Sequence, residues 1–387
     1  MYSSIKRSTL RNGRDHPPLP VRNPYISAKD TRAPSIRVNL IRILSRRRNL
    51  ALVAFTTFVF VLWLLGVGKG KANRERLRGG PRVVARDWQH LQTTASAWNA
   101  SFNQTVLILC PMKNSIEHIW HFFHMMDTLS YPRHLIHLGV LISDTSDRTY
   151  ERALELADER QYGWPQRKRY GGISVFRKDF AEEMKFHSSN VGKERHDFAL
   201  QVARRKVLAV SRTWLLNSAM KPETDWVLWM DVDVVDYDKN LIQHLLGYSA
   251  KENGDVVVPN CVWKTYNEMG SYDRNNWAET PESLEMKAKL GPDDILIEGY
   301  EKELKTGRSN MADLVPSTAT TPEIMQLDGV GGCTTLVRAD VHRKGAVFPA
   351  WPVDHQIETE GFAQLAKALG HRLIGLPKYY VYHGLYG

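Results

Sequence analysis

Two aspartates, Asp231 and Asp233, directly follow an apolar run from Trp226 to Met230. A short, bounded apolar run predicts a strand buried on both faces. Side chains alternate along a strand, so both carboxylates would project to one side at its carboxyl end, where open α/β sheets bind ligands. Neighbouring carboxylates favour a hard cation such as Mg²⁺ or Mn²⁺, which predicts a metal clamp for a diphosphate. The alternative is a solvated acidic strand end that caps nearby arginines.

A second set of acidic and histidine residues lies late in the chain: Asp328, Asp354, His355, Glu358, Glu360 and His383. Glu358 and Glu360 open a predicted helix, where the helix dipole stabilises anions, so a structural role is a serious alternative to a catalytic one. His383 lies just beyond a predicted strand, and a single histidine there is more often structural than a ligand. The set therefore gains weight only together with Asp231 and Asp233.

The segment Leu327–Cys333 contains three glycines and leads into a predicted strand at 334–338. One interpretation is a simple tight turn. The other is a loop whose missing side chains let a sugar approach the backbone. Sequence motifs for three other kinds of site are absent from the body of the chain: it has no Walker loop, no serine nucleophile elbow and no Cys/His spacing of the zinc type.

The elements that must position these residues alternate in type. Apolar runs predict strands, and apolar residues at helical spacing predict helices between them. The expected strands are 105–111, 134–142, 173–176, 226–230, 255–258, 334–338, 374–376 and 379–382. The expected helices are 115–129, 150–160, 196–219, 240–248 and 355–369. This order predicts a mostly parallel sheet with helices on both faces, and residues 261–326 are expected to be an irregular, substrate-binding insertion.

The charge of the chain is unevenly distributed. The 387 residues carry a net charge of +10, and the first 49 residues, with twelve Lys or Arg and two Asp or Glu, account for all of it. The rest of the chain is neutral, which argues against a nucleic-acid-binding body. The length allows one catalytic domain of about 250–300 residues with extensions.

One apolar run, Leu50–Val67, is long enough to cross a membrane as a helix of roughly 27 Å. A buried globular helix is the alternative. Basic residues flank the run on both sides, so charge alone barely orients it. We expect a cytoplasmic basic tail at 1–49, a transmembrane anchor at 50–68, a lumenal stem at 69–104 and a catalytic domain at 105–387. Two glycosylation sequons, at Asn99 and Asn103, fit a lumenal stem.

The three cysteines, Cys110, Cys261 and Cys333, do not form a disulfide framework. A Cys261–Cys333 bridge in an oxidising lumen and three buried thiols both remain open.

Several sequence blocks, in one order, resemble the fungal Anp1/Mnn9/Van1 family of Golgi mannosyltransferases. The resemblance covers about residues 105–383, and the blocks begin at Trp226, Asn276, Ile297, Leu327, Ile357 and Gly375. It implies a GT-A nucleotide-sugar glycosyltransferase fold, GDP-mannose as donor, Mn²⁺, and α-mannosyl transfer to the N-glycan outer chain within mannan polymerase complexes. Family members are type II membrane proteins, which implies a single-pass Golgi protein with a lumenal catalytic domain.

The resemblance also implies roles for single residues. Asp231, Asp233 and His383 would hold the metal, and Asp231 would bind it or the ribose. The other matching positions would contact donor or acceptor: Pro111 and Met112 the nucleobase, Arg205 and Arg212 the ribose or phosphate, Asp328 and Gly329 the donor sugar, and Glu358 and Glu360 both donor and acceptor.

The expected reaction retains the anomeric configuration, because donor and product are both α. We expect a front-face attack, with Glu358 or Glu360 positioning the acceptor hydroxyl. The chain is expected to elongate the α-1,6-linked mannan backbone, although the sequence does not separate α-1,6 from α-1,2 transfer. The alternative is a non-catalytic assembly subunit. A carboxylate-pair glycosidase is disfavoured because Asp231 and Asp233 are too close to flank a glycosidic bond.

Overall fold

The computed structural model describes Thr57 and residues 103–185, 198–263, 272–300, 304–314 and 320–384. The chain divides into two compact units, Met1–Ala85 and Arg86–Gly387, and every described residue except Thr57 belongs to the second. Within the described residues, no helix is both long and apolar enough to cross a membrane. The expected tail and anchor, apart from Thr57, and nearly all of the expected stem lie outside the described residues.

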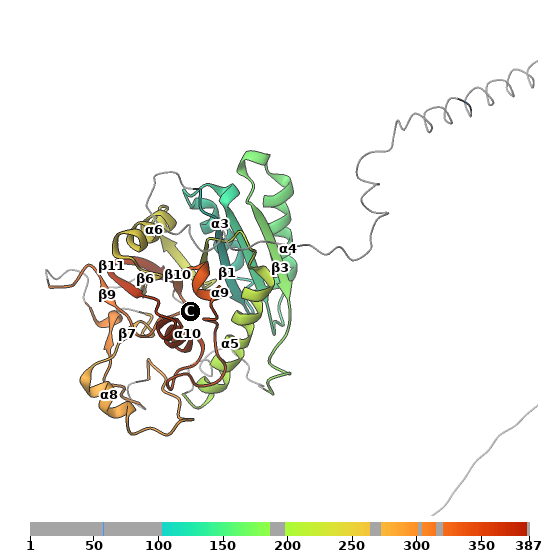
Figure 1. Ribbon diagram of the computed structural model, residues 1–387. Coiled ribbons are helices and arrows are strands. Elements are labelled where there is room, and N and C mark those ends of the chain that lie inside the picture. Colours follow the sequence, from blue (N-terminus) through green and yellow to red (C-terminus); the bar gives the residue numbers. More distant parts are fainter. Residues whose placement is uncertain are drawn as a thin grey trace, which may run out of the picture. The chain divides into compact units, whose positions relative to one another are not determined.

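A nine-stranded mixed sheet organises the second unit (Figure 1). Its strand order is β3-β2-β1-β4-β10-β6-β11-β5, with β9 beside β11. The bounds are β1 Val106–Met112, β2 Ile136–Ile142, β3 Gly172–Arg177, β4 Trp226–Met230, β5 Val234–Tyr237, β6 Val256–Trp263, β9 Met325–Gln326, β10 Thr334–Arg338 and β11 Leu373–His383. Two short strands, β7 Trp277–Ala278 and β8 Ser309–Asn310, pair with each other outside this sheet.

Helices cover both faces of the sheet. The helices are α3 Ile119–Thr128, α4 Thr149–Asp158, α5 Phe198–Ala219, α6 Leu241–Glu252, α8 Pro281–Lys287, α9 Ala339–Arg343 and α10 Glu358–Ala368. Short 3₁₀ turns cover Arg133–Leu135, Gln166–Lys168 and Met311–Asp313, and a π turn covers Glu159–Gly163. The core of one face includes residues of α3, α4 and α6, and the core of the other includes residues of α5, α9 and α10. The predicted placement of helices on both faces of the sheet is confirmed.

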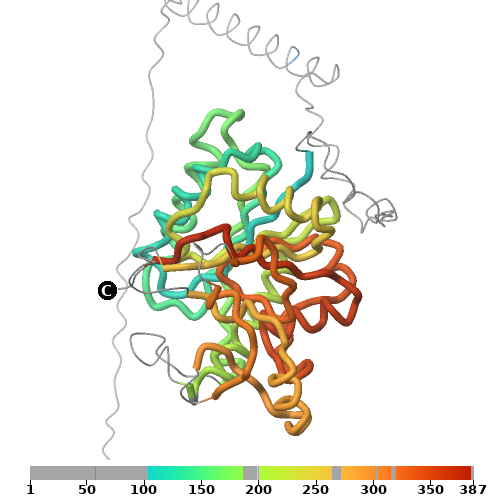
Figure 2. Tube along the Cα trace, turned by 90° about the vertical axis from the view of Figure 1, so that its left-hand side faces the viewer, coloured from blue at the N-terminus to red at the C-terminus, as the bar shows by residue number. Residues whose placement is uncertain are grey.

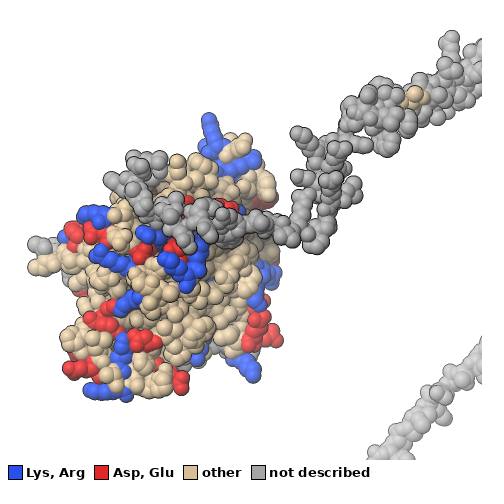
Figure 3. All heavy atoms as spheres, in the orientation of Figure 1, with Lys and Arg blue, Asp and Glu red and all other residues tan. Residues whose placement is uncertain are grey.

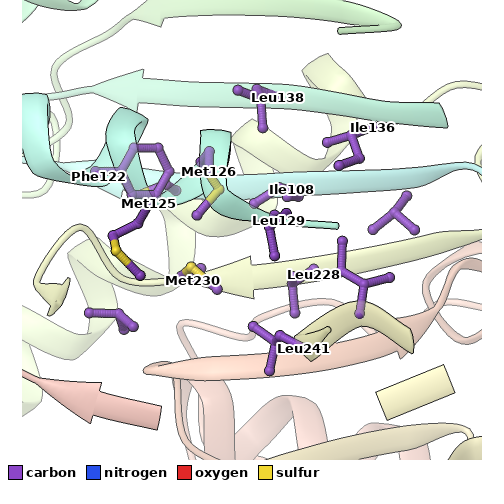
Figure 4. Packing of buried hydrophobic residues seen from close by; sticks show 14 of the residues in the cluster. Ile108, Phe122, Met125, Met126, Leu129, Ile136, Leu138, Leu228, Met230 and Leu241 are labelled. Carbon is purple, nitrogen blue, oxygen red and sulfur yellow. The ribbon is translucent and has the colours of Figure 1, made fainter. Parts of the chain in front are cut away.

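Strand β4 is buried on both faces, as the sequence predicts. Trp226, Leu228 and Met230 pack into the core beneath α3 and α6, and the intervening Val227 and Trp229 pack into the core beneath α5 and α10. Figure 4 shows Leu228 and Met230 among residues of the first core. Because each fully buried large side chain contributes about 1.5–3 kcal/mol, β4 is a rigid base for the residues that follow it.

The direction of some strands differs from the prediction. Strands β3, β2, β1 and β4 are parallel to one another, as β6 and β11 are, but β10 lies antiparallel between β4 and β6, and β5 and β9 lie antiparallel to β11. The sheet is therefore mixed, and the prediction that it is mostly parallel is wrong. The chain enters β10 beside the end of β4, with Thr334 opposite Met230, so β10 has to run back along β4. The two strands expected at 374–376 and 379–382 are one strand, β11, with a register shift after Leu376.

Where the structure describes the predicted irregular insertion, it contains the short helix α8, the 3₁₀ turn at Met311–Asp313 and the two-residue strands β7, β8 and β9. Thr280 caps this helix through a capping box with Ser283, and Pro281 occupies its first turn. In Figures 1 and 2, α8 lies at the end of the domain opposite α4. On the face shown in Figure 3, basic and acidic side chains are intermixed, which fits the neutral body expected from the sequence.

Candidate functional site

Asp231 and Asp233 lie in a turn that follows β4 rather than in the strand itself. The amide of Val234 donates to the carbonyl oxygen of Asp231 at 3.3 Å, which closes the turn. Strand alternation therefore no longer applies, and the two carboxylates have different partners. Asp231 keeps 31% of its side chain exposed, whereas Asp233 keeps 9%.

The carboxylate of Asp233 faces the imidazole of His383 at the end of β11. Its Oδ2 lies 3.1 Å from His383 Nε2, and His383 Nδ1 lies 2.8 Å from the carbonyl oxygen of Gly384. A carbonyl oxygen only accepts, so Nδ1 carries the proton. A neutral Nε2 would then direct its lone pair at the carboxylate. The contact is favourable if the ring is an imidazolium, or if both atoms are ligands of one cation.

Arg212 on α5 connects Asp231 to Glu358. Its Nη2 lies 3.1 Å from Asp231 Oδ1, and its Nε lies 3.2 Å from Glu358 Oε1. Loss of water raises the pKa of Asp231 to about 6; the guanidinium of Arg212 opposes this shift and the charge of Asp233 adds to it. Asp231 thus has the arginine partner that the alternative interpretation of the sequence described.

A buried ion network surrounds Glu360. Its Oε2 lies 2.5 Å from Arg205 Nη1, and its Oε1 accepts from Trp277 Nε1 at 2.8 Å. Arg308 lies over the Trp277 ring, 3.5 Å from the ring centroid, and binds Glu298 at 2.7 Å. Burial raises the pKa of Glu360 to about 7, while the arginines oppose the shift. Both oxygens of Glu360 are therefore engaged by the protein.

Asp328 has different partners from those of Asp231, Asp233, Glu358 and Glu360. Its side chain accepts from the amide of Glu279 at 2.7 Å and pairs with Lys367 of α10. Its backbone carbonyl accepts from Gln364. The structure therefore ties Asp328 to α10 and to the insertion, and its predicted contact with the donor sugar stays a prediction.

The glycines of the 329–332 segment are close to side chains of the protein itself. A Cβ on Gly329 would lie 2.2 Å from the Trp277 ring, and one on Gly331 would lie 1.8 Å from Asp273 Oδ2. A Cβ on Gly332 would lie 2.5 Å from Arg212. The space at these three positions is thus too small for a side chain, and packing against the protein itself is sufficient to explain the glycines.

Pro111 and Met112 end β1 beside β4. The parallel register pairs Leu109 with Trp229, so the last residues of β1 lie level with the turn that carries Asp231. Just before them in β1, Cys110 is buried, and burial raises the pKa of its thiol, with the charges of Asp231 and Asp233 adding to the shift. The expected nucleobase end of β1 is thus adjacent to the carboxylates.

Several residues of this region have no role in the sequence analysis: Asp273, Trp277, Glu298 and Arg308. Trp277 and Glu298 belong to the sequence blocks that carry the family resemblance, which was the one available signal. Arg308 and Asp273 lie outside those blocks, and their burial depends on contacts across the insertion that no local pattern reveals.

A divalent cation fits part of this arrangement. Within the ranges that the structure describes, no three His, Cys, Asp or Glu side chains are grouped so as to hold a metal ion, and Asp231 faces Arg212. The Asp233–His383 pair does have the required donors. Ligands at right angles around an octahedral ion, each about 2.1 Å from it, lie about 3.0 Å apart. A carbonyl partner on the other ring nitrogen is also the usual support of a metal-binding histidine.

The Anp1 family model matches residues 83–352. The chain is 37% identical to "Mannan polymerase complex subunit mnn9" of Schizosaccharomyces pombe, across 84% of this chain and 93% of that protein. It is 34% identical to "Mannan polymerase II complex ANP1 subunit" of Saccharomyces cerevisiae (78% of this chain, 59% of that protein) and 30% identical to "Mannan polymerase I complex VAN1 subunit" of the same yeast (72% and 60%). The chain thus spans less than two thirds of the latter two proteins.

Among solved structures, the chain is similar to the mannosyltransferase PcManGT from Pyrobaculum calidifontis in complex with GDP-Man and Mn²⁺. The TM-score is 0.42 and the identity 14%, over 86% of this chain and 67% of that one. Staphylococcus aureus TarS 1–349 in complex with UDP gives a TM-score of 0.39 and 13% identity, over 73% and 61%. At these scores the likeness carries no argument about the site.

Proposed function

The chain belongs to the Anp1 family, and from this premise we propose that it is a mannosyltransferase of a mannan polymerase complex. It uses GDP-mannose, retains the α configuration and elongates the α-1,6-linked backbone of N-glycans. The names of its relatives support the complex and the polymer. The observation that carries the enzymatic part is the contact between Asp233, which follows β4, and His383, which ends β11. The carbonyl oxygen of Gly384 holds the proton on Nδ1 of His383 and leaves Nε2 facing the carboxylate.

The catalytic domain proposed here, residues 105–387, has a GT-A fold. In this proposal Asp233 and His383 hold Mn²⁺ or another divalent cation, together with Asp231. Once bound, the ion neutralises the charge that develops on the departing diphosphate. Pro111 and Met112 contact the nucleobase from the adjacent strand end. Asp231 has to exchange Arg212 for the cation or the ribose.

If Asp231 exchanges Arg212 for the cation or the ribose, Arg212 becomes available to bind the donor. Arg212 is almost fully buried and is held by Asp231 and Glu358 at once. If Asp231 held the cation, the guanidinium of Arg212 would keep Glu358 as its partner, and the donors released by Asp231 could bind a phosphate. Glu358, rather than the fully engaged Glu360, then positions the acceptor hydroxyl.

The remaining predicted residues support the site at longer range in this proposal. Arg205 and Glu360 hold α5 against α10, and thereby hold Arg212 against Glu358. Asp328 and Gly329 shape the segment beside the donor sugar. We also propose that residues 50–68 anchor the chain as a single-pass type II protein of the Golgi membrane, with the catalytic domain in the lumen.

The test is Asp233→Ala in the full-length chain, purified in detergent and supplied with GDP-mannose, Mn²⁺ and a short α-1,6-mannoside. Loss of a metal ligand is expected to lower kcat by about 10²–10³-fold or more. Asp340→Asn is the matched control, because Asp340 pairs with Lys344 on the surface of α9. Near-normal transfer by Asp233→Ala would remove the metal clamp. Linkage analysis of the wild-type product separates α-1,6 from α-1,2 transfer.

A non-catalytic assembly subunit is the second candidate, because the relatives are named as complex subunits. In that case the purified chain would bind GDP-mannose without turnover. Transfer would appear only after addition of a paralogous subunit, and Asp233→Ala in this chain would leave that transfer unchanged.

A further inference from the structure

We propose that the Cys261–Cys333 disulfide and the aromatic ring of Tyr272 position the residues that bind the cation. The bridge joins the end of β6 to the residue just before β10, across 72 positions of sequence. Both cysteines are buried in the core on the α3 and α6 side of the sheet. This inference rests on the proposed function, and its test separates the two.

The backbone of Cys333 holds the turn that carries Asp231. The amide of Asp231 donates to the carbonyl oxygen of Cys333 at 2.9 Å. The next residue, Thr334, is the first of β10 and pairs with Met230, the last residue of β4. The position of Asp231 therefore depends directly on the position of Cys333, through this hydrogen bond.

The backbone of Cys261 holds the other side of the site. Its carbonyl oxygen accepts from the amides of Tyr272 and Asp273, at 3.0 and 3.2 Å. The ring of Tyr272 is stacked on the imidazole of His383, with centroids 3.7 Å apart and an angle of 23° between the planes. The position of His383 thus depends on a residue that Cys261 fixes.

Trp263 completes the support of His383. It is opposite His383 in the parallel pairing of β6 with β11. Its ring meets the imidazole edge-on, with centroids 5.2 Å apart and planes at 87°, and meets Tyr272 at 4.7 Å. The imidazole therefore has aromatic contacts on two sides, which leaves it little freedom to rotate away from Asp233.

The disulfide matters because these two supports come from distant parts of the chain. The residues between Cys261 and Cys333 include the irregular insertion. Without the bridge, only non-covalent contacts would hold the two ends of this long segment together. With the bridge, the Cα atoms of Cys261 and Cys333 are held 6.5 Å apart. The backbone partner of Asp231 and the backbone partner of Tyr272 are thereby kept in one arrangement.

The expected effect is on cation affinity. Outer residues that orient a metal ligand typically change affinity by 10–100-fold when they are removed. We expect the double variant Cys261→Ala/Cys333→Ala and the variant Tyr272→Ala to weaken Mn²⁺ binding at least 10-fold. Tyr272→Phe keeps the stacked ring and is expected to stay within about 3-fold of the wild type.

The experiment is a Mn²⁺ titration of the full-length chain in detergent, with free Mn²⁺ followed by its electron paramagnetic resonance signal, alone and with GDP. Thermal unfolding is measured in parallel. Phe123→Leu is the control for stability, since Phe123 is buried in the same core and its ring contacts Phe122 and Arg160, which are not site residues. This variant is expected to lower the Tm with unchanged Mn²⁺ affinity.

The outcomes are distinct. If the wild type binds no Mn²⁺, the proposed function fails. If the wild type binds Mn²⁺ but the cysteine and Tyr272→Ala variants bind it equally well, the positioning role is overturned. Equal losses in Tyr272→Phe and Tyr272→Ala would also overturn the role of the ring, because stacking would then be irrelevant.

Discussion

Nη1 of Arg205 lies 2.5 Å from Oε2 of Glu360, and both side chains are almost completely buried. The pair joins α5 to α10, the two helices that also carry Arg212 and Glu358. Removing one member of a buried pair leaves an uncompensated charge, which typically costs about 3–5 kcal/mol. The contact thus links the stability of the domain to the geometry of the candidate site.

We therefore expect Arg205→Met and Glu360→Gln to lower the free energy of unfolding, with the arginine variant at about 3–5 kcal/mol. Glu360→Gln is expected to cost less, because burial raises the pKa of Glu360 and the amide keeps the acceptor for Trp277. The double variant should be destabilised by less than the sum of the two. Urea unfolding measures all three, and simple additivity would show that the pair does not act as a unit.

Arg308 is expected to depend on its shape as well as its charge. Its guanidinium lies over the Trp277 ring and binds Glu298, so Arg308→Met leaves that buried carboxylate unpaired. Arg308→Lys keeps a charge but not the flat group, and is expected to recover only part of the loss. The midpoint of thermal unfolding measures both, with the partly exposed Arg152→Lys as a control expected to change stability by no more than about 0.5 kcal/mol. Full recovery by lysine would contradict the stacking argument.

Stability is expected to fall in acid because of His342. Its Nδ1 lies 2.7 Å from the carbonyl oxygen of Ala346, and its Nε2 accepts from Trp229 Nε1 at 3.2 Å, so the neutral ring is fully bonded. Burial lowers its pKa from 6.5 to about 4. As the pH falls, the unfolded chain therefore takes up the proton before the folded chain does. The contribution of neutral His342 to the free energy of unfolding, roughly 3 kcal/mol, is present above pH 6.5 and lost as the pH falls toward 4.

The variant His342→Gln tests this pH dependence, since an amide can donate to Ala346 and accept from Trp229 without titrating. We expect its unfolding free energy to change less than that of the wild type between pH 6.5 and 4. Parallel curves for the two proteins over this range would assign the acid sensitivity to other groups.

The glycine segment gives a further prediction. Gly331→Ala would place a Cβ against buried Asp273, and overpacking of this kind costs about 1–3 kcal/mol. Gly163→Ala is the control, since the nearest atom to its Cβ is 3.8 Å away. Thermal unfolding should separate the two, and equal stabilities would mean that the segment adjusts freely.

The sequence by itself determined the local features of this protein. It placed the strand at Trp226–Met230, the long helix now seen as α5, the aspartates after the strand and the family blocks. These features depend on neighbouring residues, because burial patterns repeat every two residues in a strand and about every four in a helix.

Only the tertiary structure decided how those features combine. It turned Asp231 toward Arg212 and Asp233 toward His383, although the two are separated by one residue. It joined Arg205 to Glu360 across 155 positions, ran β10 against β4, and chose the Cys261–Cys333 bridge over free thiols. Such pairings depend on how the helices and the insertion pack over the sheet, so the free energy that selects them is spread over contacts that no short stretch of sequence contains.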